Sequence, residues 1–117
     1  MDELTHQKLR DAMRRPAGIE AAREFLQTYV SDADMSHLRV VIEHMRNVNA
    51  VTVIDGLEGL EDVLAETQSE GVLAELVARD ANRSLDDPSD EGARIWLAQL
   101  AGRVRAWLGD AAPPARS

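Results

Sequence analysis

Ala93-Arg94-Ile95-Trp96-Leu97-Ala98-Gln99-Leu100-Ala101-Gly102-Arg103-Val104-Arg105-Ala106-Trp107-Leu108, residues 93–108, is the stretch with the clearest structural signal in this chain. Its large apolar side chains recur every three or four residues, the spacing of one face of an α-helix. Gly109 follows as a candidate C-cap, and Pro113-Pro114 would stop any continuation. The stretch therefore predicts a long amphipathic helix that ends near residue 108.

Two tryptophans lie on this helical stripe. Trp96 and Trp107 are eleven residues apart, which at 100° per residue places them within about 20° of the same direction. We expect both to face the core, because aromatic residues make up only 3% of the chain and core packing is their commonest use. A surface that binds a partner is the alternative for the same pair.

The helical spacing recurs along the preceding sequence. Segments 19–30, 35–45, 53–64 and 72–77 each predict an amphipathic helix, whereas residues 3–14 predict only a weak one. Candidate caps are Asp34 or Ser36 for the second segment, a capping box from Thr52 to Asp55 for the third, and Ser69 for the fourth. Gly56 and Gly59 fall inside a predicted helix, where a close helix crossing would account for them.

These elements predict an all-α fold, a single-domain bundle of five or six short helices. The only strand-like run, residues 51–54, is too short to build a sheet without a partner strand. We assign residues 1–110 to one helical domain, since 117 residues leave no room for a second, and residues 111–117 to a flexible C-terminal tail.

Cysteine is absent from the sequence, which excludes disulfides, thiolate metal sites and cysteine nucleophiles and fits a reducing cytosol. Neither a signal peptide nor an apolar run long enough to span a membrane is readable. We therefore expect a cytoplasmic protein without a membrane partner.

Negative charge is concentrated in the middle of the chain. Residues 47–92 hold twelve acidic side chains and only Arg79 and Arg83 as bases, so this segment has a net charge of −10. The residues before it carry −1 and those after it +3, which gives the chain its net charge of −8. Such a field repels nucleic acid and attracts a basic partner, although it would also serve solubility alone.

Catalytic and metal-binding patterns are not found in the sequence. His37 and His44 are two turns apart without a third ligand, and Asp32-Ala33-Asp34 lacks the remaining ligands of a calcium loop. No nucleophile elbow or phosphate-binding glycine loop is present, so we expect no enzyme, metal or cofactor. The only basic cluster, Arg10, Arg14 and Arg15, limits nucleic-acid binding to that arm, and we expect none.

Two acidic groups are the candidate partner-binding residues. On the predicted helix from residue 53, four acidic side chains fall opposite the apolar stripe and form a ridge, and a second group surrounds the proline of the loop before the last helix. Asp86 and Asp87 are the strongest candidates because they serve no evident helix, whereas Asp90 and Glu91 favour the helix dipole. The full set is Asp86, Asp87, Asp90, Glu91, Asp55, Glu58, Asp62 and Glu66.

Between about residues 22 and 108 the chain resembles a known family. Phe25 and Tyr29, the acidic turn at 32–34, the loop containing Pro88 and the pair Trp96-Leu97 occur in the order found in the small immunity proteins of contact-dependent growth inhibition systems, the CdiI class. The chain departs from that family at residues 80–82, where a cysteine and a tyrosine are often found. The resemblance implies a cytoplasmic helical protein that binds and neutralises a cognate toxin domain.

The charge pattern supports this interpretation independently, because an acidic surface can cover the basic substrate-binding surface of a nuclease toxin. A different function stays open: a small helical adaptor or regulatory protein whose acidic face docks a basic protein partner. The oligomeric state also stays open, since the apolar faces can be buried within one chain or across a dimer.

Overall fold

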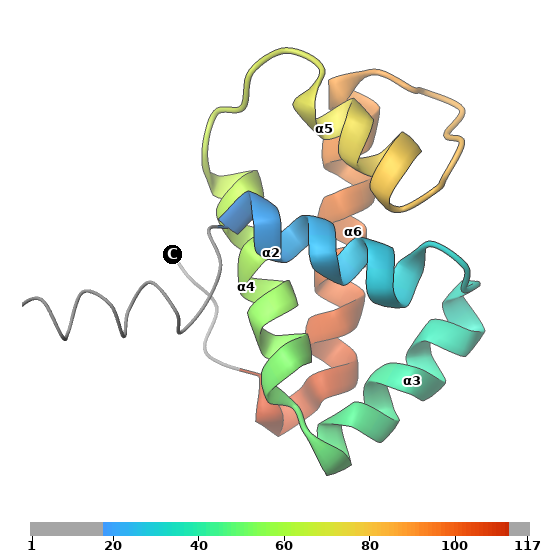
Figure 1. Cartoon of the computed structure of the whole chain (residues 1–117), viewed down its shortest axis with the longest axis vertical. Helices are drawn as coiled ribbons and strands as arrows, with labels where there is room; N and C mark the ends of the chain where they lie inside the picture. The colour runs from blue at the N-terminus through green and yellow to red at the C-terminus, as the bar shows by residue number, and fades with distance from the viewer. Residues whose placement is uncertain (1–17, 113–117) are drawn as a thin grey trace, which may run out of the picture.

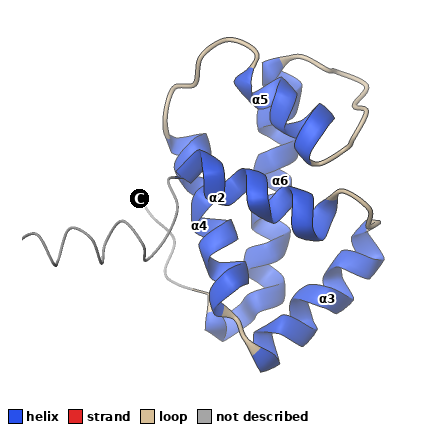
Figure 2. Cartoon of the chain, in the orientation of Figure 1, coloured by secondary structure: helices blue, strands red, loops and turns tan. Residues whose placement is uncertain are grey.

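The computed structural model describes residues 18–112. The weak helix at 3–14, the arginine cluster at 10–15 and residues 113–117 of the expected tail lie outside this part. Within it the chain is helical and contains no strand, which confirms the all-α prediction (Figure 2). The elements are α2 (Gly18–Phe25), η1 (Leu26–Val30), α3 (Met35–Val48), α4 (Val51–Ala65), α5 (Val72–Glu75), η2 (Leu76–Asp80), α6 (Asp90–Leu108) and η3 (Gly109–Ala111).

Helices α4 and α6 run side by side in opposite directions, and α2 crosses over them (Figure 1). Helix α3 packs along the second half of α6, and α5 packs against its first half. The apolar stripe of α6 thus meets α3, α4 and α5, while α2 packs on α4. One core cluster results, to which Leu97, Leu100 and Val104 contribute fully buried side chains.

The tryptophans pack against this core from its edge. Trp96 and Trp107 are both partly buried, so the expectation that they face the core is met without either being enclosed. Trp96 also lines an open cleft beside the turn at residues 31–34.

The glycines of α4 are explained by the crossing of α2, as expected. A methyl group on Gly59 would lie 2.7 Å from the main-chain nitrogen of Ala22 and 2.7 Å from the Ala21 methyl group. At Gly56 a methyl group would enter the space that the Phe25 ring fills. Because neither position carries a side chain, the backbones of α2 and α4 approach to a distance that any other residue would prevent.

The expected caps are confirmed at two helix ends. Asp34 is the N-cap of α3, and its carboxylate accepts a hydrogen bond of 2.8 Å from the His37 N–H. Gly109 is the C-cap of α6 and adopts a φ of 56°, which glycine reaches without strain.

Two other caps are wrong. Helix α4 begins one residue before Thr52, with Ala50 as its N-cap and without a side-chain cap bond. Ser69 lies before the N-cap of α5, which is Gly71 with a φ of 87°. Thr52 thus lies inside the first turn of α4, and Ser69 lies two residues before the N-cap of α5, so neither hydroxyl is at an N-cap position.

Arginine side chains serve the C-terminal ends of helices instead. Arg94 donates to the Leu64 carbonyl at the end of α4 with a bond of 2.8 Å, and Arg46 donates to the Trp107 carbonyl at the end of α6 with a bond of 3.0 Å. Arg83 donates to the carbonyl of Val30, the last residue of η1, and to that of Ala33 in the turn that follows. The guanidinium groups of Arg94 and Arg46 thus bind carbonyls in the last turn of a helix, which lack helical partners, and oppose the negative end of its dipole.

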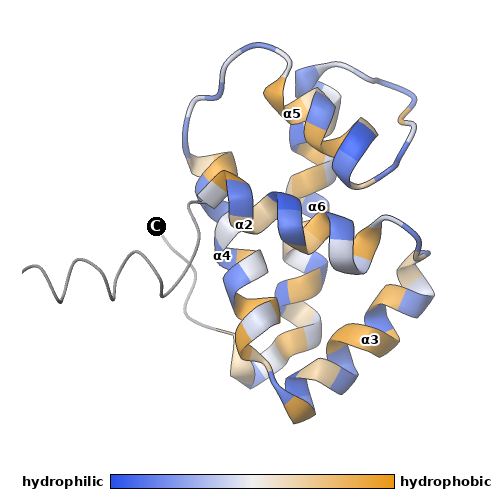
Figure 3. Ribbon diagram, in the orientation of Figure 1, coloured by the Kyte–Doolittle hydropathy of each residue, from blue (hydrophilic) through white to orange (hydrophobic). Residues whose placement is uncertain are grey.

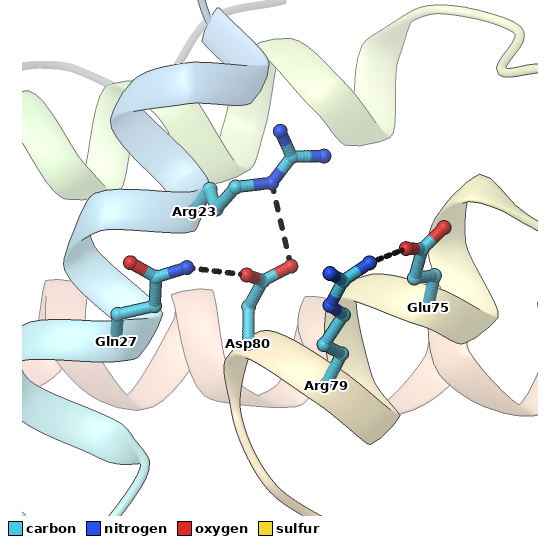
Figure 4. Close-up of polar contacts among 5 residues, drawn as sticks. All are labelled: Arg23, Gln27, Glu75, Arg79 and Asp80. Carbon is cyan, nitrogen blue, oxygen red and sulfur yellow. Dashed lines mark hydrogen bonds and ion pairs between the residues drawn. The ribbon is translucent and has the colours of Figure 1, made fainter.

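The π-helical segments η1 and η2 meet at a buried carboxylate (Figure 4). Asp80 is 3% exposed, and Gln27 donates a hydrogen bond of 2.6 Å to it. The Arg23 guanidinium lies 3.4 Å away. Among the described residues Asp80 is the one buried charged side chain, and its two partners reach it from α2 and η1.

Candidate protein-binding surface

The candidate acidic residues fall on two parts of the fold. Asp86, Asp87, Asp90 and Glu91 belong to the loop before α6 and its first turn, whereas Asp55, Glu58 and Asp62 lie on α4 and Glu66 is its C-cap. The loops at residues 66–71 and 81–89 both lie at the end of the molecule where α6 begins (Figure 1). Figure 3 shows that these loops are predominantly hydrophilic.

Asp90 joins the two loops. Its carboxylate accepts a hydrogen bond of 2.8 Å from the Gly71 N–H and one of 2.9 Å from the Ala74 N–H. These donors lower the pKa of Asp90, chiefly through Gly71. The residue therefore caps α5 from another helix, a structural role beyond the helix-dipole contribution expected from sequence.

Asp90→Asn is expected to lower the melting temperature most clearly near neutral pH. Because the folded-state pKa of Asp90 is lowered, the carboxylate stabilises the fold fully above its unfolded pKa of about 3.9, and this stabilisation is lost as pH falls through the lower folded value. Thermal unfolding of both proteins from pH 7 to pH 2.5 should show a difference that shrinks below about pH 4. Glu91→Gln is the control, and an equal pH-dependent difference for it would contradict the assignment.

Asp87 also has a structural role, so the expectation that it lacks one is wrong. Its carboxylate accepts a hydrogen bond of 3.1 Å from the Ser89 N–H. Ser89 in turn is the N-cap of α6, and its hydroxyl accepts a bond from the Gly92 N–H. Hydrogen bonds from Ser89, first from its side chain and then from its backbone, lower the pKa of Asp87. The main chain of Asp87 also closes over Gly92, where a methyl group would meet the Asp87 carbonyl.

The loop is anchored at its other end as well. Asn82 adopts the left-handed conformation, with a φ of 54°, which asparagine tolerates better than most residues. The Arg83 N–H then donates a bond of 3.0 Å to the Val77 carbonyl, and the Arg83 side chain is held by η1. Asp86 thus projects from a loop with both ends attached to the bundle.

Carboxylates without an internal partner gather at this end. Asp86 and Glu91 are exposed and make no ion pair or side-chain hydrogen bond within residues 18–112, and the same holds for Glu66 and Glu70 on the neighbouring loop. We call these four residues the acidic end. Glu70 was not among the residues predicted from sequence, because it lies in a loop and carries no periodic signal.

The other acidic group is less exposed than the helical pattern predicted. Asp55, Glu58 and Asp62 are half-buried, and only Glu66 is exposed. Helix α2 covers the α4 face of Gly56 and Gly59, so the buried arc of α4 is wider than its leucine stripe. Asp62 packs beside Gly18, and Asp55 borders a groove between α2 and α4. The ridge is therefore the margin of a helix crossing rather than a free acidic face.

One ion pair links the two long helices of the core. Arg105 of α6 and Glu61 of α4 form a bidentate ion pair with a shortest distance of 2.7 Å, and both are only partly exposed. In the part of the chain that the structure describes, no group of three or more His, Cys, Asp or Glu side chains could hold a metal ion. No helix in the same part is long and apolar enough to cross a membrane.

Comparison with known proteins gives no assignment: no family model, no curated protein and no solved structure matched this chain.

Proposed function

We propose that this protein is a non-enzymatic immunity protein that binds a cognate toxin domain and neutralises it, with the acidic end as its docking surface. The observation that carries the proposal is the arrangement of charge there. Four carboxylates without internal partners project from two anchored loops and from the first turn of α6. The nearby Arg83 and Arg94 direct their guanidinium groups to main-chain carbonyls.

This arrangement favours a basic protein partner. A surface of one sign accelerates association with a surface of the opposite sign and rejects partners of like charge. Because the loops are held by hydrogen bonds to α5, α6 and η1, little conformational freedom is lost on binding. The sequence resemblance to immunity proteins supplies the kind of partner, a toxin with a basic surface such as a nuclease.

Charge reversal at the acidic end tests the proposal. Asp86→Lys and Glu91→Lys are each expected to weaken the complex with the neighbouring gene's toxin domain about ten-fold, because they remove an attraction and introduce a repulsion. These positions are preferable to Asp87, whose replacement would also break the turn before α6. Affinity and association rate should be measured at several salt concentrations, and the salt dependence of both variants should be weaker than that of the wild type.

Asp110→Lys is the matched control. It makes the same charge change in an exposed residue just beyond the far end of α6, roughly 28 Å from Glu91 along a 19-residue helix. Affinity equal to the wild type is expected for this variant. If all three variants bind alike, the acidic end is not the docking surface; if no toxin gene adjoins this one, an adaptor function replaces immunity.

A further inference from the structure

A groove of about 270 Å³ lies between α2 and η1 on one side and the first two turns of α4 on the other. It is on a different part of the molecule from the acidic end, because Asp55 on its border precedes Glu66 by eleven residues, about 16 Å of helix. The volume is below the usual range for drug-sized ligands, about 300–1,000 Å³, and suits one long side chain better than a cofactor.

The floor of the groove is apolar and aromatic because of Gly56. The Phe25 ring occupies the space that a side chain at Gly56 would fill, and Phe25 is only 3% exposed. Tyr29 packs against it with ring centroids 5.4 Å apart and planes tilted by 44°. Tyr29 itself is half-buried, so part of its ring is available at the groove wall.

Two carboxylates from different helices border the same groove. Glu24 belongs to α2 and Asp55 to α4, and neither makes an ion pair or a side-chain hydrogen bond in the described part of the chain. Thr28 and Thr52 add exposed hydroxyl groups, and none of the described residues that line the groove is basic. Since no described side chain neutralises these two carboxylates, a cation that enters the groove is attracted by both without displacing another partner.

We infer that this groove binds an arginine side chain of a protein partner. A planar guanidinium can stack on the Tyr29 ring while its N–H groups donate to the carboxylates of Asp55 and Glu24. Lysine fits less well, because its ammonium group is a compact charge that cannot stack and bridge at once. The inference goes beyond toxin neutralisation, because it concerns a separate groove and holds for any partner that presents an arginine.

The test is to add N-acetyl-arginine amide to the isotopically labelled full chain and to measure the change in the NMR amide shifts. Saturable shifts are expected in residues 24–29 and 52–56, with a dissociation constant on the order of millimolar because one side chain supplies all contacts. N-acetyl-citrulline amide has nearly the same shape without the charge, and its shifts in these residues should be at least five-fold smaller. N-acetyl-lysine amide should bind more weakly than the arginine probe.

Variants separate the groove from general charge attraction. Asp55→Asn and the more exposed Glu24→Gln should each weaken arginine binding at least three-fold, and Tyr29→Leu should do the same through lost stacking. Asp86→Asn changes the acidic end alone and should leave the shifts in residues 24–29 unaltered. If the acidic-end variants bound the toxin like the wild type, the proposed docking surface would be wrong, but arginine binding in the groove would still be expected. The two proposals are therefore tested independently.

Three results would overturn the inference. Equal responses to arginine and citrulline would show an apolar groove without charge selection, and unchanged binding in both Asp55→Asn and Glu24→Gln would exclude the carboxylates. A response that appears only when Arg14 and Arg15 are replaced by Gln would assign the groove to this chain's own N-terminal segment rather than to a partner.

Discussion

Gly59→Ala should lower the free energy of unfolding by about 2–3 kcal/mol, although alanine is the better helix former by about 1 kcal/mol. The added methyl group would lie 2.7 Å from the Ala22 nitrogen and 2.9 Å from the Gly18 carbonyl oxygen. Both are backbone atoms of α2, so relief requires that the whole helix move away from α4. Chemical denaturation followed by far-UV circular dichroism measures the change.

Gly102→Ala is the matched control for this prediction. Gly102 lies on the exposed side of α6, and a methyl group there meets nothing within 4 Å. The same substitution should therefore raise the free energy of unfolding by about 0.5–1 kcal/mol. If Gly59→Ala stabilised the protein as Gly102→Ala does, the close crossing of α2 and α4 would be wrong.

Asp80→Ala should lower the free energy of unfolding by about 2–3 kcal/mol. The substitution removes the 2.6 Å bond from Gln27 and the ion pair with Arg23, both made to a carboxylate that is 3% exposed. Hydrogen bonds to a buried charged group contribute about 1.5–3 kcal/mol each, and part of this is offset because the carboxylate is no longer desolvated. Asp80→Asn, which keeps one acceptor for Gln27, should cost about half as much.

Glu75→Ala provides the comparison on the surface one turn away (Figure 4). Glu75 and Arg79 form an ion pair of 2.6 Å, yet their side chains are 53% and 77% exposed. Such pairs contribute at most about 0.5 kcal/mol, because water and salt screen them. Urea denaturation of the three variants should show a much larger loss in the free energy of unfolding for Asp80→Ala than for Glu75→Ala. Equal losses would contradict the buried position of Asp80.

The acidic segment that dominates the sequence has several uses in the fold. Glu61, Asp80 and Asp90 hold helices together through Arg105, Gln27 and the backbone of α5. Asp86, Glu66, Glu70 and Glu91 are left at one end of the molecule, and Asp55 borders the groove. Fewer carboxylates are therefore available to a partner than the net charge of the segment suggests. The structure reduces the candidate partner-binding residues to those without an internal role.

Local sequence patterns predicted those features that depend on a single helix, namely its position and its caps. The apolar spacing of residues 93–108 predicted α6. Gly109 was correctly identified as its C-cap, and Asp34, one of two candidates, is the N-cap of α3, because a cap bonds to its own helix. The capping box at Thr52 and the cap at Ser69 were wrong, because α4 already begins at Val51 and α5 begins only at Val72, after Gly71 as its N-cap.

Side chains that form hydrogen bonds between distant parts of the chain were not predicted from the sequence. Arg83 caps η1 from more than fifty residues away, and Asp90 caps α5 from nineteen residues away. No spacing rule connects such positions, because the distance between them along the chain carries no period. The partners Gln27 and Asp80 were missed for the same reason.

The sequence by itself determined that this protein is an all-α bundle, where its longest helix lies, and that Gly56 and Gly59 mark a close crossing. Those properties follow from the periodicity and conformational range of neighbouring residues, which are local. Only the tertiary structure decided which carboxylates are engaged and which are free to meet a partner, and that Glu24 and Asp55 border one aromatic groove. These depend on which helices cross and at which residues, and contacts between distant parts of the chain form only when the core has assembled them.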